Sequence, residues 1–91
     1  MNAAFTPRAL DEFAFWVKTD PRMAKRIIDL IKTTKRDPFG GIGKPEALRH
    51  ELKGRWSRRI DDEHRLVYRI IELNDVQVLE ILSCRFHYSK R

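Results

Sequence analysis

The chain has 91 residues, which is enough for a single domain, residues 1–91, with one modest core. Apolar residues make up 42% of it, close to the globular norm, and this excludes a disordered chain. Lysine and arginine outnumber aspartate and glutamate by 19 to 13, which gives a net charge of +6. A small domain with this charge attracts polyanions such as nucleic acids, or an acidic protein partner.

The cysteine count and the hydropathy pattern indicate the compartment. Cys84 is the single cysteine, so an internal disulfide is excluded and a reducing environment fits. No apolar run approaches the roughly 18 residues that a membrane span needs. Residues 1–5 lack the basic and apolar blocks of a signal peptide. We therefore expect a cytoplasmic protein that makes no contact with a membrane.

Two helix-start signals open the chain. Each is a capping residue followed by proline, in Thr6-Pro7 and in Asp20-Pro21. Apolar residues follow each signal at helical spacing. After the first signal they are Leu10, Phe13 and Val17, with Phe15 and Trp16 widening the stripe, and after the second they are Met23, Ile27, Leu30 and Ile31. Pro38 ends the second helix, because the residue before a proline disfavours helical angles. The sequence therefore predicts an N-terminal helix hairpin.

A glycine-rich loop follows over residues 37–45. Its Gly43-Lys44 pair invites a phosphate-binding-loop interpretation, which we reject because Pro45 stands where serine or threonine is required and no strand precedes the loop. The loop is expected to carry the chain from the helices to a sheet and to deliver Lys44 and Glu46.

Beyond this loop the apolar period changes to two, which predicts strands. They are expected at residues 48–52, 55–60, 64–72 and 76–86, with a further edge strand at residues 3–5. Turns are expected at Gly54, at residues 61–63 and at Asn74-Asp75. The predicted fold is α+β: an N-terminal helix hairpin packed on a four- to five-stranded, mainly antiparallel sheet.

Glu46, Arg65 and His87 are the candidates for chemistry. A carboxylate, a guanidinium and an imidazole are the groups needed to cleave RNA without a metal. One takes the 2′-OH proton, one stabilises the charge on phosphorus and one protonates the leaving 5′-oxygen. Alone, however, a mid-strand arginine usually belongs to a solvated face, and a histidine near the C-terminus is usually idle. Nearby arginines and aromatic residues favour a surface that binds phosphates and stacks bases.

Other kinds of site find little support. The chain has no cysteine pair, no HxxxH motif and no acid cluster at ligand spacing, so we expect neither a metal nor a cofactor. His50 and His64 do not change this expectation. Ser57 and Ser83 lie in predicted strands without a nucleophile elbow, and Cys84 is expected to pack in the core.

Four strings resemble the YoeB-type (also called Txe) toxins of the RelE/ParE toxin–antitoxin superfamily. They are RDPFGGIGKPEALRH at residues 36–50, GRWSRRI at 54–60, EHRLVY at 63–68 and CRFHY at 84–88. The resemblance runs from about Phe13 to Tyr88 and implies a RelE-like, microbial-RNase-like fold. It implies the toxin component of a type II system, a ribosome-dependent mRNA endonuclease (mRNA interferase) that cuts mRNA in the A site and inhibits translation.

The same resemblance implies roles for individual residues. Glu46 corresponds to the general base, His87 to the general acid, and Arg65 to the residue that stabilises the phosphorane-like transition state. Tyr88 corresponds to a residue that positions or stacks on the substrate. Further substrate-binding residues are expected at Arg59, Arg49, Lys44 and Glu63.

The expected partners also follow from the resemblance. They are a YefM/Axe-type antitoxin, the ribosome and its mRNA, with operator DNA bound only through the antitoxin complex; a homodimer is allowed. An acidic segment that folds on binding would neutralise the charge of +6. Two other functions stay open on the same fold: a gyrase-targeting ParE-like toxin, and a nucleic-acid-binding module without catalysis.

Overall fold

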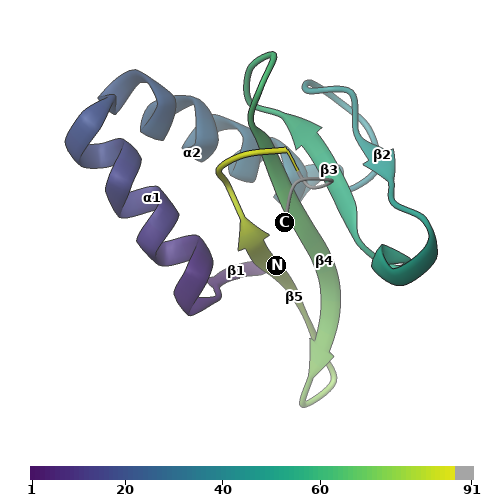
Figure 1. The fold of residues 1–91 in the computed structure, drawn as a ribbon. Helices are drawn as coiled ribbons and strands as arrows, with labels where there is room; N and C mark the ends of the chain where they lie inside the picture. Colours follow the sequence, from purple (N-terminus) through teal and green to yellow (C-terminus); the bar gives the residue numbers. More distant parts are fainter. Residues whose placement is uncertain (88–91) are drawn as a thin grey trace.

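In a computed structural model, which describes residues 1–87, two helices pack on one side of a five-stranded sheet (Figure 1). The elements in chain order are β1 (Asn2–Phe5), α1 (Pro7–Thr19), α2 (Pro21–Arg36), β2 (Glu46–Ala47), a 3₁₀ turn (His50–Leu52), β3 (Trp56–Arg59), β4 (Arg65–Leu73) and β5 (Val76–Ser83). This confirms the predicted α+β fold with its N-terminal helix hairpin. Neither helix is long and apolar enough to cross a membrane.

Both helices begin at the predicted signals. The Thr6 hydroxyl accepts a hydrogen bond from the Ala9 N–H, which caps α1, and Pro21 opens α2. The buried face of α2 consists of Ala24, Ile27, Leu30, Ile31 and Thr34, largely as the periodicity predicts.

The predicted face of α1 is partly wrong. Leu10 and Val17 are 56% and 52% exposed, whereas Trp16, which belongs to the predicted stripe, is buried together with Ala9, which does not. Polar contacts set this rotation, because the Glu12 carboxylate accepts from the Cys84 N–H and the Trp16 indole donates to the Cys84 carbonyl. An apolar count does not register such contacts.

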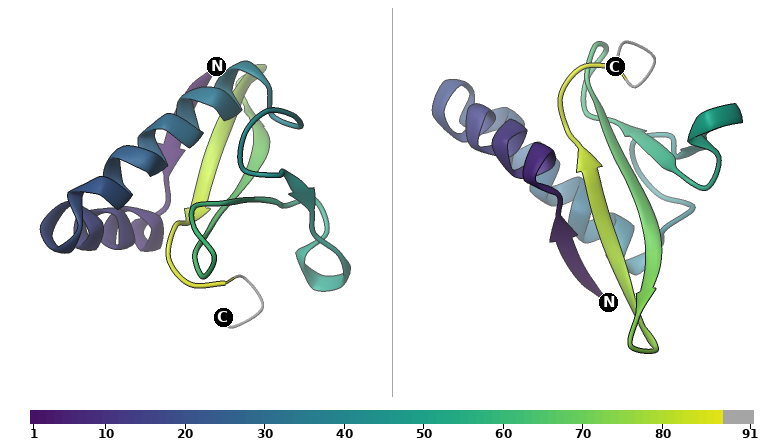
Figure 2. Two further views of the ribbon diagram at one scale, coloured as in Figure 1. Left: turned by 90° about the horizontal axis from the view of Figure 1, so that it is seen from above. Right: turned by 60° about the horizontal axis from the view of Figure 1, so that its bottom comes forward.

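The sheet has the strand order β1-β5-β4-β3-β2. Strand β1 runs parallel to β5, and the other neighbouring pairs are antiparallel. Asn74 and Asp75 both have positive φ, 52° and 65°, which gives the tight hairpin turn between β4 and β5. Figure 2 shows both helices on the same side of the sheet, and the core between the two layers contains Leu66, Tyr68 and the fully buried Cys84.

Two predicted strands are wrong in their extent. Residues 48–52 do not form a strand, since the chain pairs with β3 earlier, at Glu46–Ala47, and then enters the 3₁₀ turn with His50 at a φ of 59°. The last strand ends at Ser83 instead of residue 86, because the backbone groups of Cys84 bond to α1 rather than to the sheet.

Candidate active site

The register of β2, β3 and β4 assembles polar residues on the face of the sheet that points away from the helices. Glu46 lies opposite Ser57, and Arg59 lies opposite Arg65. Neighbouring residues of a strand point to opposite faces, so Ser57 and Arg59 share a face, while Leu66 and Tyr68 face the helices. The predicted position of Arg65 on the face outside the core is confirmed.

These residues surround a pocket of about 150 Å³. Among residues 1–87, its lining consists of Lys44, Glu46, Ser57, Arg59, Arg65 and His87. One carboxylate, one imidazole and three cationic side chains, from segments as far apart as residues 44 and 87, thus meet at one place. Such an arrangement suits the binding of an anionic group and proton transfer to and from it.

Arg65 is held rigidly in the pocket wall. The residue is 8% exposed, and its Nη1 donates to the Asp61 carbonyl at 2.8 Å and to the His64 carbonyl at 3.1 Å. Within residues 1–87, no carboxylate forms an ion pair with Arg65. Its positive charge is therefore fixed in direction and not neutralised by that part of the chain, as binding an anion requires.

The loop that carries Lys44 and Glu46 is fixed from beneath by Arg58. This arginine is fully buried on the helix-facing side of β3, where its Nη2 and Nη1 donate to the carbonyls of Asp37 at 2.5 Å and Ile42 at 2.7 Å. The Arg59 N–H donates to the Gly43 carbonyl at 2.7 Å, which joins the end of the loop to β3. The loop is thus tied to β3 at its start, through the Asp37 carbonyl, and directly before Lys44, through the carbonyls of Ile42 and Gly43.

Tyr68 completes this clamp. Its hydroxyl donates to the Pro38 carbonyl at 2.6 Å and accepts from Arg58 Nε at 3.3 Å. Burial raises the pKa of Tyr68 above its ordinary value of 10.0, and the hydrogen bond from Arg58 partly opposes that rise. Our sequence reasoning missed both clamp residues. Strand alternation could have found Arg58, because it lies two residues from both Trp56 and Ile60 and so points to the same face of the sheet, the core face. A guanidinium buried there needs hydrogen-bond acceptors.

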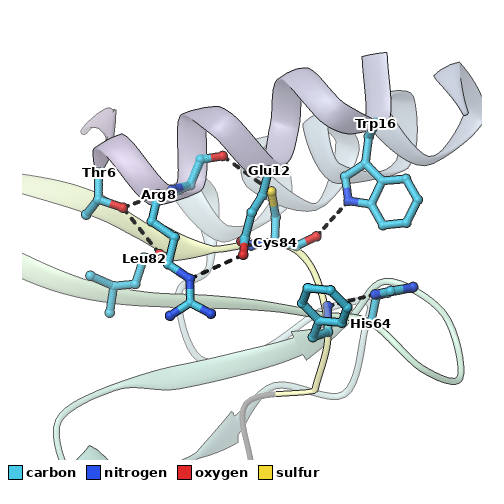
Figure 3. Close-up of polar contacts among 9 residues, drawn as sticks. Thr6, Arg8, Glu12, Trp16, His64, Leu82 and Cys84 are labelled. Atoms are coloured by element: carbon cyan, nitrogen blue, oxygen red, sulfur yellow. Dashed lines mark hydrogen bonds and ion pairs between the residues drawn. The ribbon is translucent and has the colours of Figure 1, made fainter. Parts of the chain in front are cut away.

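The segment after β5 runs back across the start of β4 (Figure 1), and it brings His87 to the pocket. It is anchored at Cys84, whose N–H donates to Glu12 Oε1 at 2.7 Å and whose carbonyl accepts from Trp16 Nε1 at 2.9 Å (Figure 3). Two residues later the Phe86 carbonyl accepts from the Arg65 N–H at 3.0 Å. Helix α1 and strand β4 together therefore set the position from which His87 reaches the pocket.

Two of the described residues expected at the site, Arg49 and Glu63, are not among the lining of this pocket. Arg49 lies beside it and, together with Glu46, lines a neighbouring hollow. Glu63 stands in the turn between β3 and β4, where its side chain is 67% exposed. Tyr88 lies outside the described residues. Ser57, for which the sequence gives no support as a nucleophile, is buried and forms part of the pocket wall.

No group of three potential metal ligands gathers among residues 1–87. The lining supplies hydrogen-bond donors, two of them arginines and one a lysine, next to a single carboxylate. This donor set fits a phosphate group better than it fits a cation.

A family model described as "YoeB-like toxin of bacterial type II toxin-antitoxin system" matches residues 5–88 of the chain. Among curated proteins, the chain is 55% identical to the toxin RelK of Mycobacterium tuberculosis over 84 residues, which cover 92% of this chain and 94% of that protein.

Three solved structures are similar along almost the whole chain. A YoeB/ParE toxin from Agrobacterium tumefaciens has a TM-score of 0.91 at 49% identity, and the match covers 97% of this chain and 100% of that one. A YoeB dimer from Staphylococcus aureus has a TM-score of 0.84 at 40% identity, with 97% and 98% covered. A chain of the heterotetrameric YoeB–YefM complex from Staphylococcus aureus has a TM-score of 0.83 at 39% identity, again with 97% and 98% covered.

Proposed function

Because the chain belongs to the YoeB-like toxins of bacterial type II toxin–antitoxin systems, we propose that it is a ribosome-dependent mRNA endonuclease. It cuts mRNA in the ribosomal A site and thereby inhibits translation. The observation that carries the proposal is the pocket in which Glu46, Arg65 and His87 line one small space. The proposed substrate makes this a cytoplasmic protein.

The proposed chemistry is transesterification without a metal. Glu46 takes the proton from the 2′-OH, and the 2′-oxygen attacks the adjacent phosphorus. Arg65 stabilises the negative charge that builds on the phosphoryl oxygens, and His87 protonates the leaving 5′-oxygen. The products are a 2′,3′-cyclic phosphate, or the 3′-phosphate that forms on its hydrolysis, and a 5′-hydroxyl.

The remaining lining residues support this assignment of roles. Lys44 and Arg59 add positive charge around the phosphate, which lowers the energy of a more highly charged transition state. A space of about 150 Å³ has room for a phosphate group but not for several nucleotides. The flanking nucleotides therefore lie outside it, where Arg49, Glu63 and Tyr88 are proposed to contact or stack on them.

We propose an antitoxin of the YefM/Axe type as the protein partner. The support is the similarity to a YoeB chain from a YoeB–YefM complex and the net charge of +6, which an acidic segment would neutralise. Operator DNA is then bound only through that complex. The similarity to a YoeB dimer supports a homodimer as a further assembly of this chain.

The test is primer extension on a defined mRNA in a bacterial translation reaction. Glu46→Gln and His87→Ala are each expected to lower the cleavage rate by about 10²–10⁴-fold, since each removes one proton-transfer group. Glu72→Gln removes an exposed carboxylate from the far end of β4 and is the matched control, with wild-type activity expected. Full activity of either site variant would contradict the proposal, and intact mRNA together with DNA damage would favour a gyrase-targeting toxin.

A further inference from the structure

His64 makes a contact that none of the roles above uses. Its Nδ1 accepts a hydrogen bond from the Phe86 N–H at 2.7 Å (Figure 3). The Phe86 carbonyl in turn accepts from the Arg65 N–H at 3.0 Å. His64 and Arg65, which are consecutive in the chain, therefore bind both backbone polar groups of Phe86, the residue before His87.

The conformation of Phe86 explains why such a hold is needed. Its φ is 68°, in the left-handed region that a non-glycine residue rarely adopts. A non-glycine residue keeps such a conformation only where neighbouring groups fix it. At Phe86 the left-handed turn directs the chain so that His87, the next residue, lines the pocket beside Arg65.

The imidazole that provides the acceptor is itself fixed. The edge-to-face contact with Trp16 has a ring-centroid distance of 4.8 Å and an interplanar angle of 78°. The His64 side chain is 11% exposed, and its Nε2 lies 3.7 Å from Glu63 Oε1. Because Nδ1 accepts a hydrogen bond, it carries no proton, and the hydrogen bond assigns the proton of the neutral ring to Nε2.

We infer that His64 is a positioning residue for the proposed general acid. Its unprotonated Nδ1 holds the Phe86 N–H and thereby keeps His87 directed into the pocket. The inference rests on the proposed function, in which His87 protonates the leaving oxygen. Trp16 then supports the site in two ways, because its indole N–H holds the Cys84 carbonyl and its ring fixes the plane of the His64 ring.

Two substitutions separate the hydrogen bond from the ring. His64→Phe keeps an aromatic ring against Trp16 and removes the acceptor. His64→Asn removes the ring and keeps an acceptor oxygen at nearly the same place as Nδ1. We expect His64→Phe to lower kcat for cleavage of mRNA on programmed ribosomes by about 10- to 100-fold with little change in KM, because a misplaced catalytic group slows the chemical step rather than binding. His64→Asn should restore most of the rate.

A double variant tests whether the effect passes through His87. In the His87→Ala background, His64→Phe should lower the rate no further, because there is then no acid to position. Equal losses in His64→Phe and His64→Asn, or a full additional loss in the His87→Ala background, would overturn the inference.

NMR tests the inference on the wild-type protein without a cleavage assay. Nitrogen NMR should show His64 with an unprotonated Nδ1, and amide exchange at Phe86 should be slow in the wild type and in His64→Asn but fast in His64→Phe. A protonated Nδ1, or a rapidly exchanging Phe86 amide in the wild type, would overturn the inference whatever the cleavage assay gives. Absence of cleavage by a wild type that shows both NMR features would instead refute the proposed function.

Discussion

The hydroxyl of Tyr68 gives a quantitative test of the clamp beneath the active-site loop. Tyr68→Phe removes one oxygen atom and keeps the ring in the core. The Pro38 carbonyl loses its hydrogen bond at 2.6 Å, and Arg58 Nε loses its acceptor at 3.3 Å. The first loss costs about 1 kcal/mol as an ordinary hydrogen bond. The second leaves a donor of a fully buried cation unpaired, at about 1–2 kcal/mol more.

We therefore expect Tyr68→Phe to lower the free energy of unfolding by about 2–3 kcal/mol, measured by urea denaturation followed by circular dichroism. For a domain of this size that corresponds to a fall in Tm of roughly 10–20 °C. The amide of Arg59 should also exchange faster, because its acceptor, the Gly43 carbonyl, lies in the loop that the clamp holds.

Thr34→Val is the control for the loss of a buried hydroxyl. The Thr34 hydroxyl donates to the Leu30 carbonyl within α2 at 2.7 Å, and that carbonyl is already an acceptor in the helix. Its removal should cost under about 1 kcal/mol. A Tyr68→Phe protein that loses less than about 0.5 kcal/mol, with an unchanged rate of Arg59 amide exchange, would refute the clamp reasoning.

Two further predictions concern the same region. The folded-state pKa of Tyr68 is raised above 10.0, so the Tyr68 hydroxyl loses its proton in the unfolded chain at a lower pH than in the folded protein. The contribution of this hydroxyl to stability is therefore complete below pH 10.0 and is lost as pH rises from there toward the folded-state pKa. Unfolding measured at increasing pH should show a steeper alkaline loss of stability for the wild type than for Tyr68→Phe, and parallel curves would contradict the prediction. Gly43→Ala should destabilise by about 2–4 kcal/mol in urea unfolding, because its φ is 90° and a Cβ would lie 3.1 Å from atoms of both Arg58 and Leu30. Gly54→Ala has a φ of 92° but no atom within 4 Å, so it should cost only the strain of about 1–2 kcal/mol, and equal losses in the two variants would contradict the packing argument.

Local signals were sufficient to predict most of the fold. The pairs Thr6-Pro7 and Asp20-Pro21 start both helices, and Asn74-Asp75 forms the expected tight turn. Predictions were wrong where a distant contact decides the local structure. The rotation of α1 is one case, since its partner Cys84 lies 68 residues from Trp16 in the chain. Apolar periodicity within a window does not contain that information.

The candidate site shows the same division. Strand alternation was enough to place Arg65 outside the core. The chemistry of RNA cleavage and the resemblance both suggested Glu46 and His87 as its neighbours. The resemblance suggested Arg59, and Lys44 was expected from the loop that also delivers Glu46. The residues that hold the site in shape were missed. Arg58 looks like one more surface cation in a basic sequence, and its role depends on two carbonyls and a hydroxyl that only the fold brings within reach. A supporting residue of this kind is defined by its partners, which are distant in sequence.

The measurement that tests the central claim most directly is end-group analysis of mRNA after incubation with the protein and programmed ribosomes. Acid–base transesterification by Glu46, Arg65 and His87 predicts a 5′-hydroxyl on the downstream fragment and a 2′,3′-cyclic phosphate or 3′-phosphate on the upstream one. Both fragments should form about 10²–10⁴-fold more slowly with His87→Ala. Fragments that carry a 5′-phosphate and a 3′-hydroxyl, or mRNA that stays intact with the wild type, would contradict it.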